Sequence, residues 1–295
     1  MDQALPRAAQ RDHIVDILIA ERAPRLTASR LWALVKPPLY RLLDYDRARR
    51  MADAIADLPG RETLDYVSEL LALEVEAAGL EHVPTAGKVV IICNHPTGIA
   101  DGLAVYQGLK AIRGDMIFYA NADALRVSPR LASVIIPVEW VEHKRTRERT
   151  RQTLVQSKAA FEDERAVAVF PAGRIARRDE NGRLTDPAWM PTALSLARRY
   201  KAPVLPIHVL GPSSTLFHLF NRVSPELRDI TLFHELLNKR GGRFELTAGR
   251  PIPAEAFEGD DASATLALKH YVERVLCEGP DAPFDPRPPP GSPAP

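Results

Sequence analysis

After Pro84 the sequence alternates short β-rich runs with longer helical runs, and no other feature constrains the fold as strongly. Strands are expected at 89–93, 116–119, 134–138, 166–170, 204–210 and 244–247, and helices near 100–112, 147–161, 188–200 and 262–276. Alternation of this kind is typical of an α/β protein. The sequence therefore predicts a mixed, mostly parallel sheet that is covered by helices on both faces.

The residues before Pro84 carry helical patterns instead. Residues 11–80 are expected to form successive helical stretches, and the last of these, 63–78, places its apolar side chains on one stripe. Breaks between the stretches are expected at Pro24, Pro37, Pro38, Pro59 and Gly60. An N-terminal helical layer beside the sheet follows from this pattern.

These patterns divide the chain into three parts. Residues 1–85 are expected to form the helical region, which we also consider as a membrane-docking layer, and residues 86–278 the α/β domain. Residues 279–295 are rich in proline, and this composition predicts a disordered tail.

Composition and charge exclude several classes of protein. The 39 basic and 38 acidic residues give a formal net charge of +1, which does not favour a nucleic-acid partner. Cys93 and Cys277 are the only cysteines, so neither a disulfide framework nor a zinc site is expected, and a reducing cytoplasmic compartment fits best. The N-terminus lacks the pattern of a signal peptide, and no run approaches the ~18 to 20 apolar residues of a membrane-spanning helix.

Residues 26–43 combine apolar and aromatic side chains with cations. Trp32, Tyr40 and several leucines alternate with Arg25, Arg30, Lys36 and Arg41. This combination is typical of a segment that lies on a membrane surface, and it predicts a peripheral protein on the inner face of the cytoplasmic membrane. An ordinary helix that packs on the core and breaks at the two prolines is an equally good interpretation.

The segment 89–102 carries the clearest chemical signal. An apolar strand runs directly into Asn94, His95 and Pro96, and a helix is expected to begin a few residues later, close to Asp101. In open α/β sheets, ligands bind at the carboxyl ends of the strands. A carboxylate beside a histidine fixes its tautomer, so that the other ring nitrogen can take a proton from a hydroxyl. Alternatively, His95 only bonds within the loop and Asp101 only favours the helix N-terminus.

Residues 94–102, Asn-His-Pro-Thr-Gly-Ile-Ala-Asp-Gly, resemble the catalytic motif of the glycerolipid acyltransferase family, in its bacterial hemolysin-like, ornithine-lipid-related branch. Residues 170–174, Phe-Pro-Ala-Gly-Arg, resemble the Phe-Pro-Glu-Gly block of that family, and 202–208 resemble its late proline-containing strand. Residues 236–242, followed by 249–253, are similar to the C-terminal segment of the branch. The family usually has four residues between histidine and aspartate. The five residues found here are shared with the hemolysin-like branch.

The resemblance implies a role in lipid metabolism. It implies transfer of a fatty acyl group from acyl-ACP (acyl carrier protein) or acyl-CoA to a hydroxyl of a lyso-lipid, of the lysophospholipid or lyso-ornithine-lipid type, without a cofactor, a metal ion or a covalent enzyme intermediate. His95 and Asp101 would be the catalytic residues. The expected substrate-binding residues are Asn94, Gly98, Phe170, Pro171, Gly173, Arg174 and Arg177.

Ala172 departs from the family pattern, because it replaces the usual glutamate of the block. Arg174, Arg177 and Arg178 follow it and could form charge-assisted bonds with an anionic acceptor, although Arg178 better fits a solvated turn. The basic run 144–149 resembles in position a second acceptor-binding block, yet a solvated helix face explains it as well.

Three alternative functions can be compared with acyl transfer. Cys93 lies two residues before His95, so an acylated cysteine is one alternative, although a small buried residue is the usual occupant at the end of an apolar strand. A serine hydrolase is disfavoured because no Gly-x-Ser-x-Gly motif occurs. Finally, the loss of the glutamate at Ala172 would also suit a non-catalytic protein that binds lipid or docks on membranes.

Overall fold

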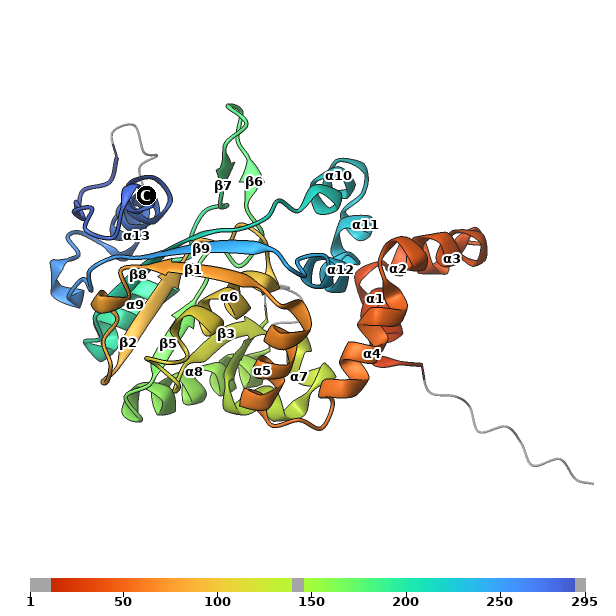
Figure 1. Ribbon diagram of the computed structural model, residues 1–295, viewed down its shortest axis with the longest axis horizontal. Helices are drawn as coiled ribbons and strands as arrows, with labels where there is room; N and C mark the ends of the chain where they lie inside the picture. The colour runs from red at the N-terminus through yellow and green to blue at the C-terminus, as the bar shows by residue number, and fades with distance from the viewer. Residues whose placement is uncertain (1–11, 140–145, 290–295) are drawn as a thin grey trace, which may run out of the picture.

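The computed structural model describes residues 12–139 and 146–289, and in these ranges a sheet lies between layers of helices (Figure 1). The strands of the sheet are β1 (Glu74–Ala78), β2 (Val89–Cys93), β3 (Ile117–Asn121), β4 (Ile135–Val138), β5 (Ala166–Val169), β8 (Val204–Leu210) and β9 (Arg243–Ala248). Their order is β1-β9-β8-β2-β5-β3-β4. The five strands from β8 to β4 are parallel, β9 is antiparallel to β8, and β1 is parallel to β9. The prediction of a mixed, mostly parallel sheet is confirmed.

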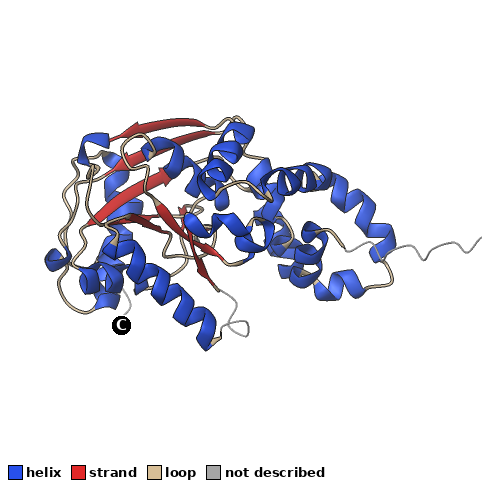
Figure 2. Cartoon of the chain, turned by 90° about the horizontal axis from the view of Figure 1, so that it is seen from below, coloured by secondary structure: helices blue, strands red, loops and turns tan. Residues whose placement is uncertain are grey.

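Helices cover both faces of this sheet, as Figure 2 shows from below. They are α1 (Ile14–Arg22), α2 (Pro24–Ala28), α3 (Trp32–Leu42), α4 (Tyr45–Ile55), α5 (Gly60–Leu71), α6 (Ile99–Leu109), α7 (Asp123–Val127), α8 (Arg147–Glu162), α9 (Thr192–Tyr200), α10 (Thr215–Val223), α11 (Pro225–Asp229), α12 (Leu232–Leu237) and α13 (Asp261–His270). A π-helical turn, η5 (Tyr271–Val275), continues α13. A short hairpin of β6 (Arg177–Arg178) and β7 (Leu184–Thr185) stands apart from the sheet.

The central strand β2 explains why two helical layers are needed. Val89, Ile91 and Cys93 point into one apolar cluster, which contains α6, whereas Val90 and Ile92 point into a second cluster, which contains α9. All five residues of the strand are buried. A strand that is buried on both faces must be apolar throughout, and this is why the run was recognisable in the sequence.

Two prolines lie where the sequence does not predict them. Pro37 and Pro38 are inside α3, whereas a break between helices was expected there. Each proline removes one backbone donor from the helix. The helix tolerates this because Ala33 and Leu34, whose carbonyl groups lose their partners, are exposed and can bind water instead.

The helix expected over 63–78 is also wrong in its second half. Helix α5 ends at Leu71, where Ala72 adopts a left-handed conformation with φ of +45°, and the next residues form strand β1. The Glu and Ala residues of this strand favour helices, but pairing with β9 overrides that preference. The sheet therefore includes a strand from residues 1–85, for which helices alone were expected.

The tail is packed where the structure describes it, in contrast to the expected disorder. The ring of Phe284 lies 5.3 Å from that of Phe257 and 5.3 Å from that of Tyr271, and the Tyr271 hydroxyl donates to the carbonyl oxygen of Ala282 at 2.7 Å. These contacts bind residues 279–289 to the face of the sheet covered by α13. Residues 290–295 lie outside the described ranges.

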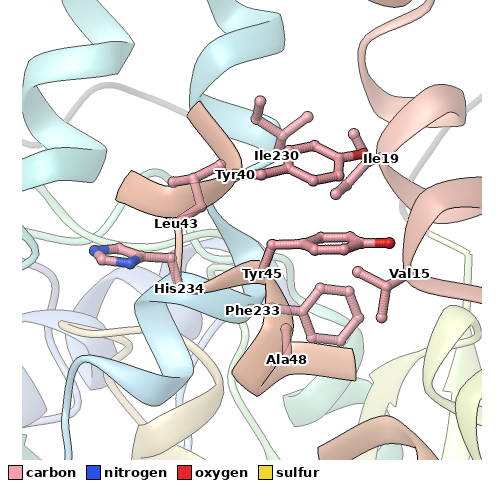
Figure 3. A pocket seen from close by; sticks show the side chains of 9 residues that line it. All are labelled: Val15, Ile19, Tyr40, Leu43, Tyr45, Ala48, Ile230, Phe233 and His234. Atoms are coloured by element: carbon pink, nitrogen blue, oxygen red, sulfur yellow. The ribbon is translucent and has the colours of Figure 1, made fainter. Parts of the chain in front are cut away.

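The N-terminal helices meet the rest of the protein along an apolar seam (Figure 3). Val15, Tyr40 and Tyr45 from the first four helices face Ile230, which follows α11, and Phe233 of α12. The cavity between them is about 10 Å³, no more than one water molecule requires. This seam is a packing contact. The residues predicted to form the site lie elsewhere.

Candidate active site

Two sequence blocks that are far apart in the chain meet at the carboxyl edge of the sheet. Strands β2 and β5 are parallel neighbours, so the loops that follow them leave the sheet side by side. The first loop carries His95 and the second begins with Phe170. Their ring centroids are 4.7 Å apart, and the backbone N–H of Ala176 donates to the carbonyl oxygen of His95 at 2.9 Å. The topology thus brings together the two blocks that resemble the acyltransferase motifs.

His95 and Asp101 are in direct contact. Nδ1 of His95 lies 2.9 Å from Oδ2 of Asp101, whose side chain is completely buried, while the side chain of His95 is 17% exposed. Nδ1 is buried and has no hydrogen-bond partner of regular geometry among the described residues, so the carboxylate is its nearest polar contact shown. The contact assigns Nδ1 to the carboxylate and leaves Nε2 as the nitrogen that can accept a proton.

The carboxylate of Asp101 is held by its own helix. It accepts hydrogen bonds from the backbone N–H groups of Thr97 at 2.9 Å and Gly98 at 3.0 Å, and from the Thr97 hydroxyl at 2.5 Å. These bonds cap the N-terminus of α6. The same carboxylate thus caps the helix, as one interpretation of Asp101 expects, and contacts the imidazole, while its catalytic role stays a prediction. Capping gives the carboxylate a fixed position beside His95.

Two glycines shape the loops around this pair. Gly98 has φ of +100°, and a Cβ atom there would lie only 3.0 Å from Cδ1 of Ile175. Gly173 has φ of +58°, and its N–H donates to the carbonyl oxygen of Phe170 at 3.0 Å. Both conformations favour glycine. The tight turn foreseen as one explanation of Gly173 is present, and substrate contact by either glycine stays a prediction.

Other expected binding residues take part in the scaffold. The side chain of Asn94 donates to the carbonyl oxygen of Val209 at 2.9 Å and accepts from its N–H at 2.7 Å. Asn94 thereby extends the contact between β2 and β8. The carbonyl oxygen of Pro171 accepts from the N–H of Met190 at 3.0 Å. These bonds fix the two loops in place, while contact of Asn94 and Pro171 with substrate stays a prediction.

The arginines after Gly173 lie in different surroundings. Arg174 is exposed and Arg177 is half-buried in β6. Arg178 donates to the carbonyl oxygen of Gly182 at 2.8 Å across the β6–β7 hairpin, which projects beyond the sheet in Figure 1. Burial, followed by the charges of Arg178 and Lys239, lowers the pKa of His218, so this hairpin lies near α10. The contact of Arg178 stabilises the hairpin. Arg174 and Arg177 are therefore the remaining candidates for binding an acceptor.

The second basic run divides at a gap in the described residues. Residues 144 and 145 lie outside them, whereas 146–149 open helix α8. Arg149 forms an ion pair with Glu139, with 2.6 Å between Nη1 and Oε2, and Arg147 is exposed. A solvated helix face, the alternative interpretation, describes these residues well.

Cys93 lies beneath this site and is completely buried. Burial, with a smaller effect from the negative charge of Asp101, raises the pKa of its thiol well above the usual value. The thiolate, not the thiol, is the nucleophilic form of cysteine. The surroundings of Cys93 therefore disfavour the acylated-cysteine alternative.

One further acidic residue lies at the site and was not foreseen from the sequence. The carboxylate of Asp186 accepts from the backbone N–H of His95 at 3.1 Å and from the indole N–H of Trp189 at 2.8 Å. Asp186 lies 91 residues beyond His95 in the chain, in a loop without periodic pattern. Its place beside His95 follows from the packing of that loop and could not be read from local spacing.

Known proteins resemble this chain over most of its length. A sequence model described as "Acyltransferase" matches residues 17–259. A lyso-glycine lipid O-acyltransferase of Phocaeicola vulgatus is 30% identical over 224 residues, which are 74% of this chain and 77% of that protein. A lyso-glycine lipid O-acyltransferase of Bacteroides thetaiotaomicron is 26% identical over 268 residues, 89% of this chain and 95% of that protein.

Among solved structures, the 1-acyl-sn-glycerophosphate acyltransferase PlsC of Thermotoga maritima aligns with a TM-score of 0.48 and 14% identity, over 90% of this chain and 94% of that one. The family assignment rests on the sequence matches. The matched range 17–259 contains the His95 loop, the Phe170 block and Asp186. The chain therefore belongs to the glycerolipid acyltransferase family and is an enzyme that transfers acyl groups.

Proposed function

We propose that this enzyme moves a fatty acyl group from acyl-ACP or acyl-CoA to a hydroxyl of a lyso-lipid, with His95 as general base and Asp101 as its partner. The observation that carries this proposal is the 2.9 Å contact between His95 Nδ1 and Asp101 Oδ2 at the carboxyl edge of the sheet. The family membership and the names of the two bacterial relatives support a lyso-lipid as acceptor.

In the proposed reaction Nε2 of His95 takes the proton of the acceptor hydroxyl as its oxygen attacks the thioester carbonyl carbon. Asp101 stabilises the imidazolium that forms. The carbon–sulfur bond then breaks while the new ester is retained, and the proton passes from His95 to the departing thiolate. The products are an acylated lipid and a free thiol. The transfer uses no metal ion and no acyl-enzyme.

The acceptor is proposed to carry an anionic head group. Arg174 and Arg177 follow the loop that contacts His95, and Ala172, which replaces the family's usual glutamate, is buried in an apolar cluster. That position therefore contributes no carboxylate. A lyso-lipid built on an amino acid, such as a lyso-glycine or lyso-ornithine lipid, and a lysophospholipid are the classes to compare.

The function is tested by measuring thiol release from acyl-ACP and acyl-CoA with a panel of these acceptors. Intact-lipid mass spectrometry identifies the product. We expect thiol release to depend on one acceptor class and to match the ester formed in a one-to-one ratio. Acceptor-independent release would indicate a thioesterase, and no release with any pair of substrates would favour the alternative of a protein that only binds lipid.

The enzyme must also reach a substrate that resides in a membrane, and helix α3 suggests how. Across 12–139 and 146–289, no helix is long and apolar enough to cross a bilayer. On α3 and just before it, Leu31 is 62% exposed and Leu34 74% exposed, whereas Trp32 is half-buried against Tyr40. Arg30 and Arg41 are exposed nearby. We propose that these leucines enter the headgroup boundary of the cytoplasmic membrane from its inner face.

Replacing Leu31 and Leu34 together by glutamate is expected to weaken binding to phosphatidylglycerol vesicles by about 10-fold or more, because each buried leucine contributes on the order of 1.5 to 3 kcal/mol. Vesicle sedimentation measures the effect, and binding of the unaltered protein should fall as salt rises. Trp32 is not replaced, because it packs against Tyr40 and its loss would disturb the fold as well as the docking.

The matched control replaces Leu154 and Val155 on α8, which are 51% and 58% exposed, by glutamate. This pair should sediment normally. Turnover of a dispersed short-chain acceptor should be unchanged in both double variants. If both pairs weakened sedimentation equally, exposed apolar side chains in general, rather than α3, would be responsible.

Replacing Cys93 by alanine is expected to leave at least about half of the activity, because direct transfer needs no thiol and the substitution removes little buried volume. The thiol-release assay measures this. A peptide containing acylated Cys93, trapped by mass spectrometry after incubation with donor alone, would contradict the proposed direct transfer.

A further inference from the structure

Asp186 holds the backbone of the proposed general base. It is only 4% exposed, and each of its two carboxylate oxygens lies 3.1 Å from the backbone nitrogen of His95. On the other side of the same residue, the carbonyl oxygen of His95 accepts from the N–H of Ala176. His95 is thus held at both its backbone N–H and its carbonyl group. The position of its imidazole depends on these two contacts.

Asp186 is in turn fastened to the C-terminal helix by Glu273. One oxygen of Glu273 accepts from the backbone N–H of Asp186 at 2.6 Å, and the other accepts from the Thr185 hydroxyl at 2.9 Å and from the ammonium group of Lys269 at 2.7 Å. Glu273 lies in the π-helical turn η5. Turns of this kind are rare in helices and frequent at functional sites.

The two carboxylates of this cluster, Asp186 and Glu273, have different kinds of partner. The hydrogen bonds that reach the Asp186 carboxylate come from neutral N–H groups of His95 and Trp189, whereas Glu273 is neutralised by Lys269. Burial, followed by the charge of Glu273, raises the pKa of Asp186 to about 7, and attraction to protonated His95 opposes this rise. Ionised Asp186 is therefore most stable when His95 carries a proton. General-base catalysis creates that state.

We propose that Asp186 is a positioning residue of the acyl-transfer site, which holds the His95 backbone and adds a second negative charge that favours the protonated imidazole. This inference rests on the proposed role of His95 as general base. Among the described residues, Cys93 and Glu273 are the other titratable groups that act on Asp186, and Glu273 is paired with Lys269. The thiol stays neutral and the Lys269–Glu273 pair balances itself, so the charge of Asp186 is the one in this cluster that bears on the imidazole of His95.

The test is the pH dependence of kcat/KM in Asp186→Asn, measured by thiol release. Asparagine keeps an oxygen that can accept from the His95 N–H but carries no charge. Without that charge the imidazolium is less favoured, so the acid limb of the profile moves to lower pH. We also expect kcat in Asp186→Ala to fall about 10- to 100-fold, the range known for residues that orient a functional ligand, with little change in KM. Asparagine should restore part of that loss.

The matched control is Asp261→Asn. Asp261 is also an acidic residue of the α13 region, but it pairs with Arg198 at the end of α9. Its profile should coincide with that of the unaltered enzyme. If Asp186→Ala does not fold, the pH dependence of kcat/KM in Asp186→Asn is by itself the test of the inference. An acid limb that stays in place or moves to higher pH in Asp186→Asn would overturn the inference. If His95→Ala retained full turnover, the proposed function would fail instead, so the two failures are distinguishable.

Discussion

Replacing His95 by alanine is expected to lower acyl transfer by ~10²- to 10⁴-fold, the usual contribution of a general base, while leaving the fold intact. The side chain of His95 is partly exposed at the end of β2. The contacts to Asp186 and Ala176 are made by the backbone of His95, which the substitution keeps. Single-turnover thiol release at saturating acceptor measures the loss. Thermal unfolding of the variant should match that of the unaltered protein.

His270→Ala serves as the control for this substitution, since His270 is exposed on α13 and lies outside the proposed site. It should retain normal turnover. A folded His95→Ala enzyme with near-normal turnover would show that another group accepts the proton, and the mechanism proposed here would be wrong.

The second large effect is expected for Asp101→Asn. The amide keeps the size of the side chain but removes the negative charge that stabilises the imidazolium and selects its tautomer, so we expect a loss of about 10³- to 10⁴-fold in kcat. The amide oxygen can still accept from the N–H groups of Thr97 and Gly98, which share one carboxylate oxygen, but the NH2 group would replace the oxygen that accepts from the Thr97 hydroxyl. Some loss of thermal stability should therefore accompany the loss of activity.

Asp260→Asn separates these two effects. Asp260 caps helix α13 by accepting from the N–H of Ser263 at 2.7 Å, as Asp101 caps α6, but it lies away from the imidazole. This variant tests what an aspartate-to-asparagine change at a helix cap does by itself, and its turnover should be normal. If Asp101→Asn lost no more activity than Asp260→Asn, the carboxylate of Asp101 would be a helix cap and nothing more.

The parts of the fold that were predictable are those in which burial decides the residue types. Strand β2 was foreseen at its observed bounds because both of its faces are buried, and β8 was foreseen for the same reason. Strand β1 was not, because its alternation of Glu with Val and Ala reflects an edge position that only β9 defines. Pairing between segments so distant in the chain leaves no local pattern in either of them.

The same distinction holds at the active site. His95 and Asp101 could be proposed together because a strand, a short loop and the first turn of a helix carry them within one segment. Asp186 and Glu273 could not, since Asp186 lies in a loop 91 residues beyond His95 and Glu273, which contacts Asp186, lies in a π-helical turn still further along the chain. Among the arginines after Gly173, Arg178 was assigned to a turn from the sequence, but its contact across the β6–β7 hairpin depends on local folding that the sequence does not show.

The pairing of β1 with β9 has a consequence for how the chain assembles during synthesis. Strands β2, β5, β3 and β4 can pair as soon as the ribosome has released residue 169, and β8 can join them before β9 exists. Strand β1 is the first strand to be synthesised, whereas its partner β9 is the last. The backbone groups of β1 that pair with β9 therefore stay unpaired while most of the polypeptide is produced. Helix α5, which leads into β1, waits with it. A nascent chain halted at residue 242 would therefore leave both β1 and β8 open to pairing with other chains, and such fragments should aggregate.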